Sequence, residues 1–153
     1  MKERLLVSDV KNAIDQNGPR PPIILIAGLR KVGKTFILLQ LRDSYVDSVY
    51  IDCSIGDKAR NQLEGFMRNP HGVLLLDEVT TLKEYESLMA ALYDSLGGSK
   101  SWKAKAVITA SSAAHLCKLA AGKLGGGRST IFYLPPITFV EYLYFTDKIP
   151  DFI

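Results

Sequence analysis

Residues 23–35, IILIAGLRKVGKT, are the stretch of sequence that decides the fold. The first five residues form a continuous apolar run rich in β-branched side chains, which is typical of a strand buried on both faces of a parallel sheet. Glycines follow at positions 28 and 33, and the sequence from Lys34 to about Arg42 has the character of a helix. The segment therefore predicts a strand, a glycine-containing loop and a helix in direct succession.

The loop at residues 28–35 matches the pattern G-x-x-x-x-G-K-[ST], which binds phosphate groups between a strand and a helix. Glycines let backbone N–H groups curl round an anion, and the N-terminus of the helix adds partial positive charge. Lys34 is expected to reach the β- and γ-phosphates of a nucleotide, and the Thr35 hydroxyl to bind Mg²⁺. The predicted nucleotide-binding residues are Gly28, Leu29, Arg30, Lys31, Val32, Gly33, Lys34, Thr35 and Phe36.

Further strands and helices alternate along the rest of the chain. Strands are expected at 48–53, 73–77, 104–110 and 131–134, and helices at 2–17, 57–68 and about 112–121. Two capping-box patterns, Thr81–Glu84 and Thr138–Glu141, predict further helix starts, and Gly97-Gly98 is expected to end the first of these two helices. Parallel strands need crossover connections, which helices supply, so the alternation predicts a doubly wound α/β sheet of about five strands.

An acidic pair, Asp77 and Glu78, follows the apolar run at 73–76. Asp77 is expected to hold Mg²⁺ together with Thr35, and Glu78 to orient and polarise an attacking water. The alternative is that the pair only begins a solvated turn. A GTPase would carry D-x-x-G here and N-K-x-D later, and this chain has neither, while small-molecule kinases often lack the second carboxylate. The pair therefore favours ATP hydrolysis or an ATP-driven switch.

Hydroxyl side chains end the strand expected at 104–110, at Thr109, Ser111 and Ser112. A polar side chain at this point can contact the γ-phosphate or the attacking water, because ligands of such sheets bind at the carboxyl ends of the strands. Ser111 is the residue we expect to do so, with Ser112 and Thr109 as alternatives. The other interpretation is a serine that caps the following helix.

No acidic residue lies between Asp94 and Glu141, but six basic residues do: Lys100, Lys103, Lys105, Lys118, Lys123 and Arg128. One interpretation is a nucleic-acid-binding face, and the other is a solvated surface with some charge facing the phosphates. Arg128 differs because it follows a run of glycines and precedes a strand. Its permanent charge suits a developing phosphoryl charge, in cis or from a neighbouring subunit, unless it is a surface arginine.

Composition excludes several other classes of protein. The chain is 47% hydrophobic and 23% charged, which is a globular balance, and a net charge of +3 is too small to indicate nucleic acid by itself. No apolar run approaches the roughly 18 residues of a membrane span, and no signal-peptide pattern is present, so a cytoplasmic location is expected. Cys53 and Cys117 lack neighbouring His or Cys ligands and are expected to be buried and reduced.

With these motifs in place, the chain resembles the prokaryotic AAA-superfamily ATPases of the ASCE division, in a subgroup with a basic phosphate loop. The shared motifs, within residues 4–145, are GLRKVGKT at 28–35, Asp77-Glu78, TASS at 109–112, Gly127-Arg128 and LPPITFVEYL at 134–143. The last motif is the most specific, because no nucleotide chemistry requires it. Ala110 departs from the subgroup, which usually has Gly there. The resemblance implies sheet order 5-1-4-3-2, Mg-ATP binding and slow ATP hydrolysis.

The resemblance also implies a domain organisation. Residues 1–153 are expected to form one ATPase core, with an N-terminal helix within 1–18 and a helix at 138–146 that leads to a further C-terminal region in relatives. That last helix is apolar nearly all round, which predicts self-association. An unidentified protein partner is expected to bind through the C-terminal region that relatives carry. The leading hypothesis is an ATPase motor or switch. The alternatives are a nucleic-acid-associated ATPase, of the loader or transposition-helper type, and an ATP-binding scaffold with little hydrolysis.

Overall fold

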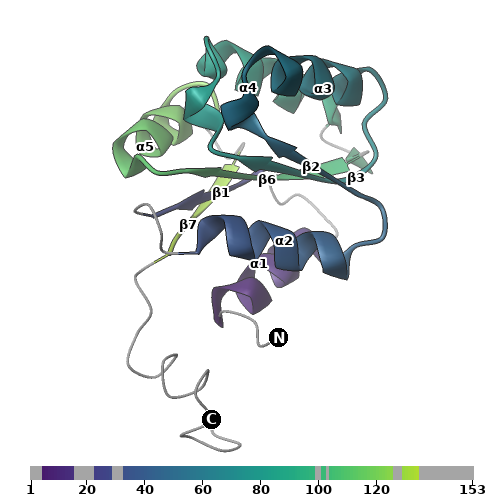
Figure 1. Ribbon diagram of the computed structural model, residues 1–153, viewed down its shortest axis with the longest axis vertical. Coiled ribbons are helices and arrows are strands. Elements are labelled where there is room, and N and C mark those ends of the chain that lie inside the picture. Colours follow the sequence, from purple (N-terminus) through teal and green to yellow (C-terminus); the bar gives the residue numbers. More distant parts are fainter. Residues whose placement is uncertain are drawn as a thin grey trace, which may run out of the picture.

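Five parallel strands form the centre of the molecule in the computed structural model (Figure 1). The structure describes residues 5–15, 23–28, 33–98, 101–102, 104–125 and 129–134. The strands of the sheet are β1 (Ile23–Ala27), β2 (Ser48–Asp52), β3 (Gly72–Asp77), β6 (Ala104–Ala110) and β7 (Ser129–Tyr133). Their order is β2-β3-β6-β1-β7. This is the predicted order 5-1-4-3-2 taken from the opposite edge, so the predicted α/β fold is confirmed.

Helices cover both faces of the sheet (Figure 1). On one face lie α1 (Leu5–Asp15) and α2 (Lys34–Ser44). On the other face lie α3 (Asp57–Arg68), α4 (Tyr85–Ser95) and α5 (Ala113–Ala121). Two short 3-10 helices, η1 (Cys53–Ile55) and η2 (Val79–Thr81), follow β2 and β3 directly. No helix of the described residues is long and apolar enough to cross a membrane.

Strand β1 divides its apolar side chains between two separate cores, and all five of its residues are buried. Ile23 and Leu25 pack into the core under α3, α4 and α5, whereas Ile24 packs into the core under α1 and α2. Successive side chains of a strand point to opposite faces, so a strand covered on both sides needs apolar residues without alternation. The continuous run at 23–27 meets this requirement.

One of the predicted helix signals is wrong. Thr81 does not begin a capping box, because it ends η2 and its Oγ1 donates to the carbonyl oxygen of Glu78 at 2.7 Å. Helix α4 begins only at Tyr85, and its N-cap residue Glu84 makes no side-chain capping bond. The prediction that this helix ends at Gly97-Gly98 is confirmed, because α4 ends at Ser95 with Leu96 as its C-cap residue. The two glycines form a short strand, β4, which pairs antiparallel with β5 (Ser101–Trp102). The second capping box, at 138–141, lies outside the described residues.

The two cysteines differ in their surroundings. Cys53 is buried at the start of η1, and burial is the main cause that raises the pKa of its thiol to about 12. Cys117 is exposed on α5, so the prediction that both cysteines are buried is wrong for this residue. The small hydrophobic character of a cysteine does not fix its side of a helix, and α5 turns Leu116 and Leu119 inward instead.

The turn before β3 gives a stability prediction. Gly72 has φ +65°, and a Cβ atom there would overlap the carbonyl oxygen of Asp47. Gly72→Ala is therefore expected to lower the free energy of unfolding by about 2–5 kcal/mol, from left-handed backbone strain and overpacking together. The matched control is Gly56→Ala, since Gly56 has φ +73° but nothing within 4 Å of an added Cβ atom, and should lose only about 1–3 kcal/mol from backbone strain. Urea denaturation measures both, and equal losses would contradict the steric explanation.

Candidate functional site

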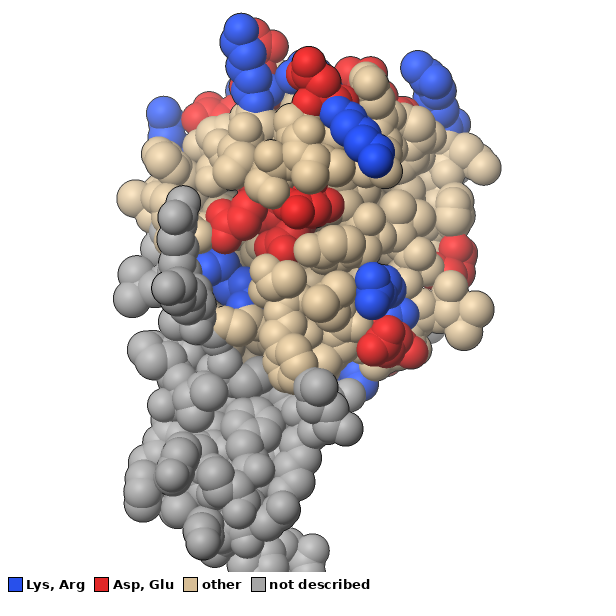
Figure 2. Space-filling model, viewed as in Figure 1, with Lys and Arg blue, Asp and Glu red and all other residues tan. Residues whose placement is uncertain are grey.

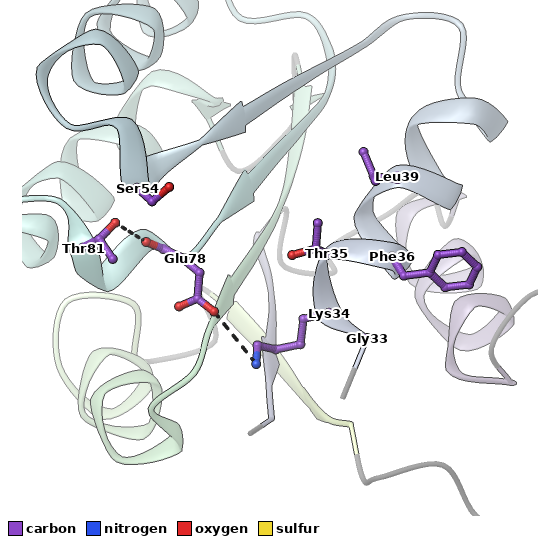
Figure 3. A pocket seen from close by; sticks show the side chains of 8 residues that line it. All are labelled: Gly33, Lys34, Thr35, Phe36, Leu39, Ser54, Glu78 and Thr81. Atoms are coloured by element: carbon purple, nitrogen blue, oxygen red, sulfur yellow. Dashed lines mark hydrogen bonds and ion pairs between the residues drawn. The ribbon is translucent and has the colours of Figure 1, made fainter. Parts of the chain in front are cut away.

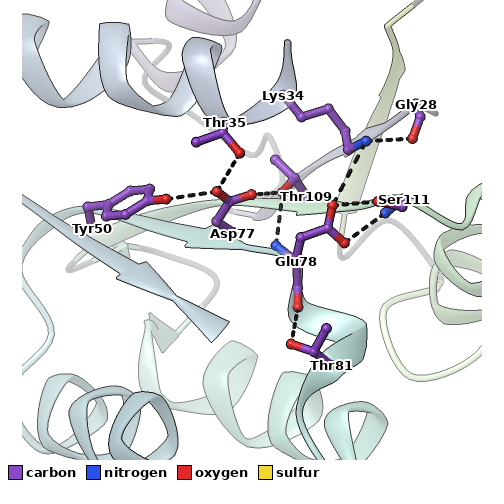
Figure 4. A network of polar contacts seen from close by, with 9 residues as sticks. All are labelled: Gly28, Lys34, Thr35, Tyr50, Asp77, Glu78, Thr81, Thr109 and Ser111. Carbon is purple, nitrogen blue, oxygen red and sulfur yellow. Dashed lines mark hydrogen bonds and ion pairs between the residues drawn. The ribbon is translucent and has the colours of Figure 1, made fainter. Parts of the chain in front are cut away.

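The candidate residues meet at the carboxyl edge of the sheet, after β1, β3 and β6 (Figure 4). Strand β6 lies between β1 and β3, so the two strands that carry the phosphate loop and the acidic pair are not direct neighbours. The gap is closed by side chains, because the first turn of α2 reaches across to the acidic pair. The parallel register thus brings together residues that are about 40 positions apart in sequence.

The first turn of α2 presents Lys34 and Thr35 to the acidic pair (Figures 3 and 4). Gly33, which precedes them, has φ 102°, a left-handed conformation that favours glycine. The Lys34 side chain is buried, and its Nζ donates to the carbonyl oxygen of Gly28 at 2.6 Å. The same Nζ lies 4.0 Å from Oε1 of Glu78. A buried ammonium group is thus held at the N-terminus of a helix, where an anion is favoured.

The carboxylate of Asp77 is buried and accepts hydrogen bonds from three hydroxyl groups (Figure 4). Oδ2 accepts from Thr35 Oγ1 and from Tyr50 Oη, each at 2.7 Å. Oδ1 accepts from Thr109 Oγ1 at 2.9 Å. Burial, followed by the hydrogen bond and the charge of Asp77, raises the pKa of the Tyr50 phenol well above its ordinary value. The phenol therefore stays protonated and can act as a donor.

Glu78 has a left-handed backbone, with φ 56°, which costs a non-glycine residue roughly 1–2 kcal/mol. Its amide N–H donates to Thr109 Oγ1 at 3.1 Å, so one buried hydroxyl links Asp77 and Glu78. Its carboxylate accepts from Ser111 Oγ at 2.5 Å and from the Ser111 amide at 3.1 Å. Backbone strain of this kind gathers at functional sites and needs surrounding contacts that maintain it.

The three hydroxyl residues after β6 have separate contacts. Ser112 is the helix cap, because its Oγ accepts from the amide of His115 at 3.2 Å and begins α5. Ser111, the first choice from sequence, contacts Glu78, and Thr109 contacts both acidic residues. The capping interpretation is therefore confirmed for Ser112. Contact between Ser111 and a nucleotide stays a prediction.

A hollow of about 650 Å³ opens beside these residues (Figure 3). Small-molecule sites have volumes of roughly 300–1,000 Å³. Its lining residues are Gly33, Lys34, Thr35, Phe36, Leu39, Ser54, Glu78 and Thr81. Sequence reasoning missed Leu39, Ser54 and Thr81. Ser54 and Thr81 follow β2 and β3 closely, so the rule that ligands bind at the carboxyl ends of strands could have found them.

Five of the predicted site residues lie outside the part of the chain that the structure describes: Leu29, Arg30, Lys31, Val32 and Arg128. Their contacts with a nucleotide stay predictions. The predicted site residues that the structure does describe all lie at the carboxyl edge of the sheet: Gly28, Gly33, Lys34, Thr35, Phe36, Asp77, Glu78 and Ser111.

Charge is distributed unevenly over this face of the molecule. Figure 2 shows acidic side chains gathered near its centre, and basic side chains mainly round them. Within the described residues, the basic stretch does not form one face. Lys105 donates to the carbonyl oxygen of Ile14 under α1, and burial lowers the pKa of its ammonium group. Lys118 lies 3.6 Å from Glu86 on the opposite side of the sheet.

Comparisons with known proteins agree with the fold. A sequence model described as an AAA domain matches residues 20–143. A DNA replication initiation factor superposes with a TM-score of 0.62 and 18% identity over 92% of this chain and 48% of its own. Cdc6p from Pyrobaculum aerophilum superposes with a TM-score of 0.60 and 21% identity, over 93% of this chain and 47% of its own. AMPPCP-bound DnaA from Aquifex aeolicus superposes with a TM-score of 0.57 and 17% identity, over 97% of this chain and 51% of its own.

At these identities the structural likeness shows the fold alone. The chain spans about half the length of the three solved structures. No curated protein matches the sequence.

Proposed function

The chain belongs to the AAA domain family, and from that premise we propose that it binds Mg-ATP and hydrolyses it to ADP and phosphate. The observation that carries the proposal is the convergence of Lys34 and Thr35 on the acidic pair. Thr35 Oγ1 lies 2.7 Å from Asp77 Oδ2, and Lys34 Nζ lies 4.0 Å from Glu78 Oε1. A cation, a hydroxyl and two carboxylates at a helix N-terminus supply the parts that phosphoryl transfer to water requires.

The residues present suit Mg²⁺. Thr35 donates its only hydroxyl proton to Asp77, which leaves the lone pairs of its oxygen free for a cation. The described residues hold no cluster of three or more His, Cys, Asp or Glu side chains that would form a complete cage. Mg²⁺ is usually bound by one or two carboxylates together with phosphates and waters, so two protein oxygens are sufficient. When bound, Mg²⁺ neutralises charge on the phosphate oxygens.

Lys34, the first residue of α2, also supports phosphate binding. Its Nζ contacts Gly28 and Glu78, and a phosphate oxygen at this helix terminus would replace these partners with a stronger charge. Glu78 then acts as the general base that takes the proton of the attacking water. The two donors of Ser111 fix the direction of its carboxylate before nucleotide arrives. A base must lie within hydrogen-bond reach of the proton that it abstracts, so a water must enter between Glu78 and the phosphate.

Steady-state phosphate release, measured with Mg²⁺ and then with EDTA, tests the proposal. Turnover that disappears with EDTA supports hydrolysis by an ATPase motor or switch. Mg-ATP binding without turnover would support the scaffold alternative, and absence of binding would overturn the proposal. The cytoplasmic location, the single-core organisation of residues 1–153 and self-association stay predictions.

The nucleic-acid alternative rests on the basic stretch, and one structural relative is named as a DNA replication initiation factor. Filter binding of DNA over a salt series separates the nucleic-acid-associated ATPase from the motor or switch and from the scaffold. Phosphate contacts make the affinity fall steeply with salt, and the absence of such a dependence would remove this alternative.

Arg128 gives a further prediction. If its guanidinium stabilises the charge of the transition state, Arg128→Ala should lower turnover about tenfold and leave ATP affinity nearly unchanged, since one charge-assisted hydrogen bond is lost only in the transition state. Turnover per subunit that rises with protein concentration would show action in trans. Arg68→Ala is the control, because Arg68 is exposed at the end of α3. Equal turnover in the Arg128 variant and the parent would make Arg128 a surface residue.

A further inference from the structure

Tyr50 reaches the acidic pair from a neighbouring strand, and the motifs of the site do not include it (Figure 4). In the register of β2 and β3, Tyr50 pairs with Leu75, and Asp77 lies two residues further along β3. Side chains two residues apart on a strand share a face, and a diagonal neighbour on the next strand is within reach of an aromatic side chain. The phenol spans this diagonal and places its Oη 2.7 Å from Asp77 Oδ2.

The ring of Tyr50 is held independently of its hydroxyl group. It packs against the core under α1 and α2, and the guanidinium carbon of Arg42 lies 6.0 Å from the ring centroid. A phenylalanine would make these contacts equally well. The hydroxyl is therefore not needed for packing, and its one described partner is the carboxylate of Asp77.

The hydroxyl changes which oxygen of Asp77 remains available. A carboxylate oxygen has about two acceptor sites, so the donors Thr35 and Tyr50 together fill those of Oδ2. Oδ1 accepts only from Thr109 among the described residues and keeps one site. Without Tyr50, either oxygen would have a free site and the carboxylate would be held by one donor fewer.

We propose that Tyr50 is a positioning residue for the metal site: its hydroxyl fixes the orientation of the Asp77 carboxylate beside Thr35, the residue with which Asp77 is proposed to hold the cation. The inference rests on the proposed function, because it requires that Asp77 takes part in binding a divalent cation. Partners that orient a metal-binding carboxylate typically contribute 10–100-fold to metal affinity.

The test is Mn²⁺ binding in the presence of saturating ADP, followed by the EPR signal of free Mn²⁺ and requiring no turnover. Tyr50→Phe is expected to weaken Mn²⁺ binding about tenfold. Its ADP affinity without metal, measured by calorimetry, should equal that of the parent. A residue that only supports packing would not separate these two affinities.

The matched control is Tyr45→Phe. Tyr45 Oη also donates to a carboxylate at 2.7 Å, but its partner is Asp15 at the end of α1, and burial again raises the pKa of the phenol. This variant should bind Mn²⁺ like the parent. Thermal unfolding checks that both variants fold, and Tyr50→Leu, which also lacks the hydroxyl, must show the same loss of Mn²⁺ affinity.

The outcomes are distinct. A parent that binds neither ADP nor Mn²⁺ overturns the proposed function and the inference with it. A parent that binds both, with a Tyr50→Phe variant of equal or higher Mn²⁺ affinity, overturns the inference alone. A tenfold loss in Tyr50→Phe, absent in Tyr45→Phe, supports it.

Discussion

Replacement of Glu78 by Gln is expected to lower ATP turnover by roughly 10²–10⁴-fold and to leave Mg-ATP binding intact. Gln has the shape of Glu, and its amide oxygen can accept from the Ser111 amide while its NH2 group donates to Ser111 Oγ, but it cannot accept a proton from the attacking water. Phosphate release under saturating ATP measures the loss, and calorimetry measures binding. The substitution is expected to lower the rate of hydrolysis and not the affinity for Mg-ATP, because Glu78 is expected to contact the attacking water and not the nucleotide.

Glu84→Gln is the matched control for this experiment. Glu84 also has a left-handed backbone, with φ 58°, and it is exposed before α4, where its described partner is Arg60 at 4.0 Å. The control removes the same charge from the same backbone conformation outside the hollow. Turnover should stay within about twofold of the parent, because Glu84 does not line the hollow and surface substitutions usually change the free energy of unfolding by no more than about 0.5 kcal/mol. A Glu78→Gln variant with the turnover of its control would show that Glu78 is not the base.

Removal of the Lys34 side chain is expected to weaken ATP binding itself by about 10–100-fold, the range that corresponds to a charge-assisted hydrogen bond of 1.5–3 kcal/mol. Lys34 is buried at the start of α2, and its ammonium group lines the hollow. Lys34→Ala therefore removes a positive charge from the place where the phosphates are expected. Calorimetric titration with Mg-ATP measures the change in affinity.

Lys118→Ala controls for the loss of a positive charge. Lys118 is exposed on α5 and lies 3.6 Å from Glu86, away from the hollow. It should leave ATP affinity unchanged. If Lys34→Ala bound Mg-ATP as tightly as the parent, the assignment of residues 28–35 as the phosphate loop would be wrong.

Most of the sheet could be predicted because its strands are short apolar runs between glycines and polar residues. The segment predicted at 73–77 is β3 at Gly72–Asp77, and the one at 104–110 is β6. Burial on both faces requires such runs, so the pattern and the structure have one physical cause. The order of the strands came from resemblance and not from the pattern, since an apolar run does not specify its neighbour.

The failed predictions share a different cause. The Thr81–Glu84 pattern is a local signal, and the turn after β3 overrides it by taking residues 79–81 into η2. The run predicted as a strand at 131–134 would suit a strand covered on both faces, but it falls in β7, an edge strand, and Tyr133 is 58% exposed there. Both outcomes depend on neighbours in space, which propensities along the chain do not contain.

The candidate site was predictable only as far as its motifs extend. Lys34, Thr35, Asp77 and Glu78 belong to recognisable patterns. In the structure Lys34, Thr35 and Glu78 line one hollow, and Asp77 is buried behind it, where it accepts a hydrogen bond from Thr35. Tyr50 carries no such signal, because its contact with Asp77 requires the register of β2 against β3. A shift by one residue would turn the phenol to the opposite face of the sheet.

The location of the nucleotide is the central claim, and NMR spectroscopy of the 16.9 kDa chain tests it most directly. Mg-ADP is titrated into ¹⁵N-labelled protein, and shifts of the backbone amide signals are recorded. The largest shifts are expected at Gly33, Lys34, Thr35 and Phe36, whose N–H groups lie at the N-terminus of α2. Shifts concentrated elsewhere, or none at saturating Mg-ADP, would contradict the assignment of this edge of the sheet as a nucleotide site.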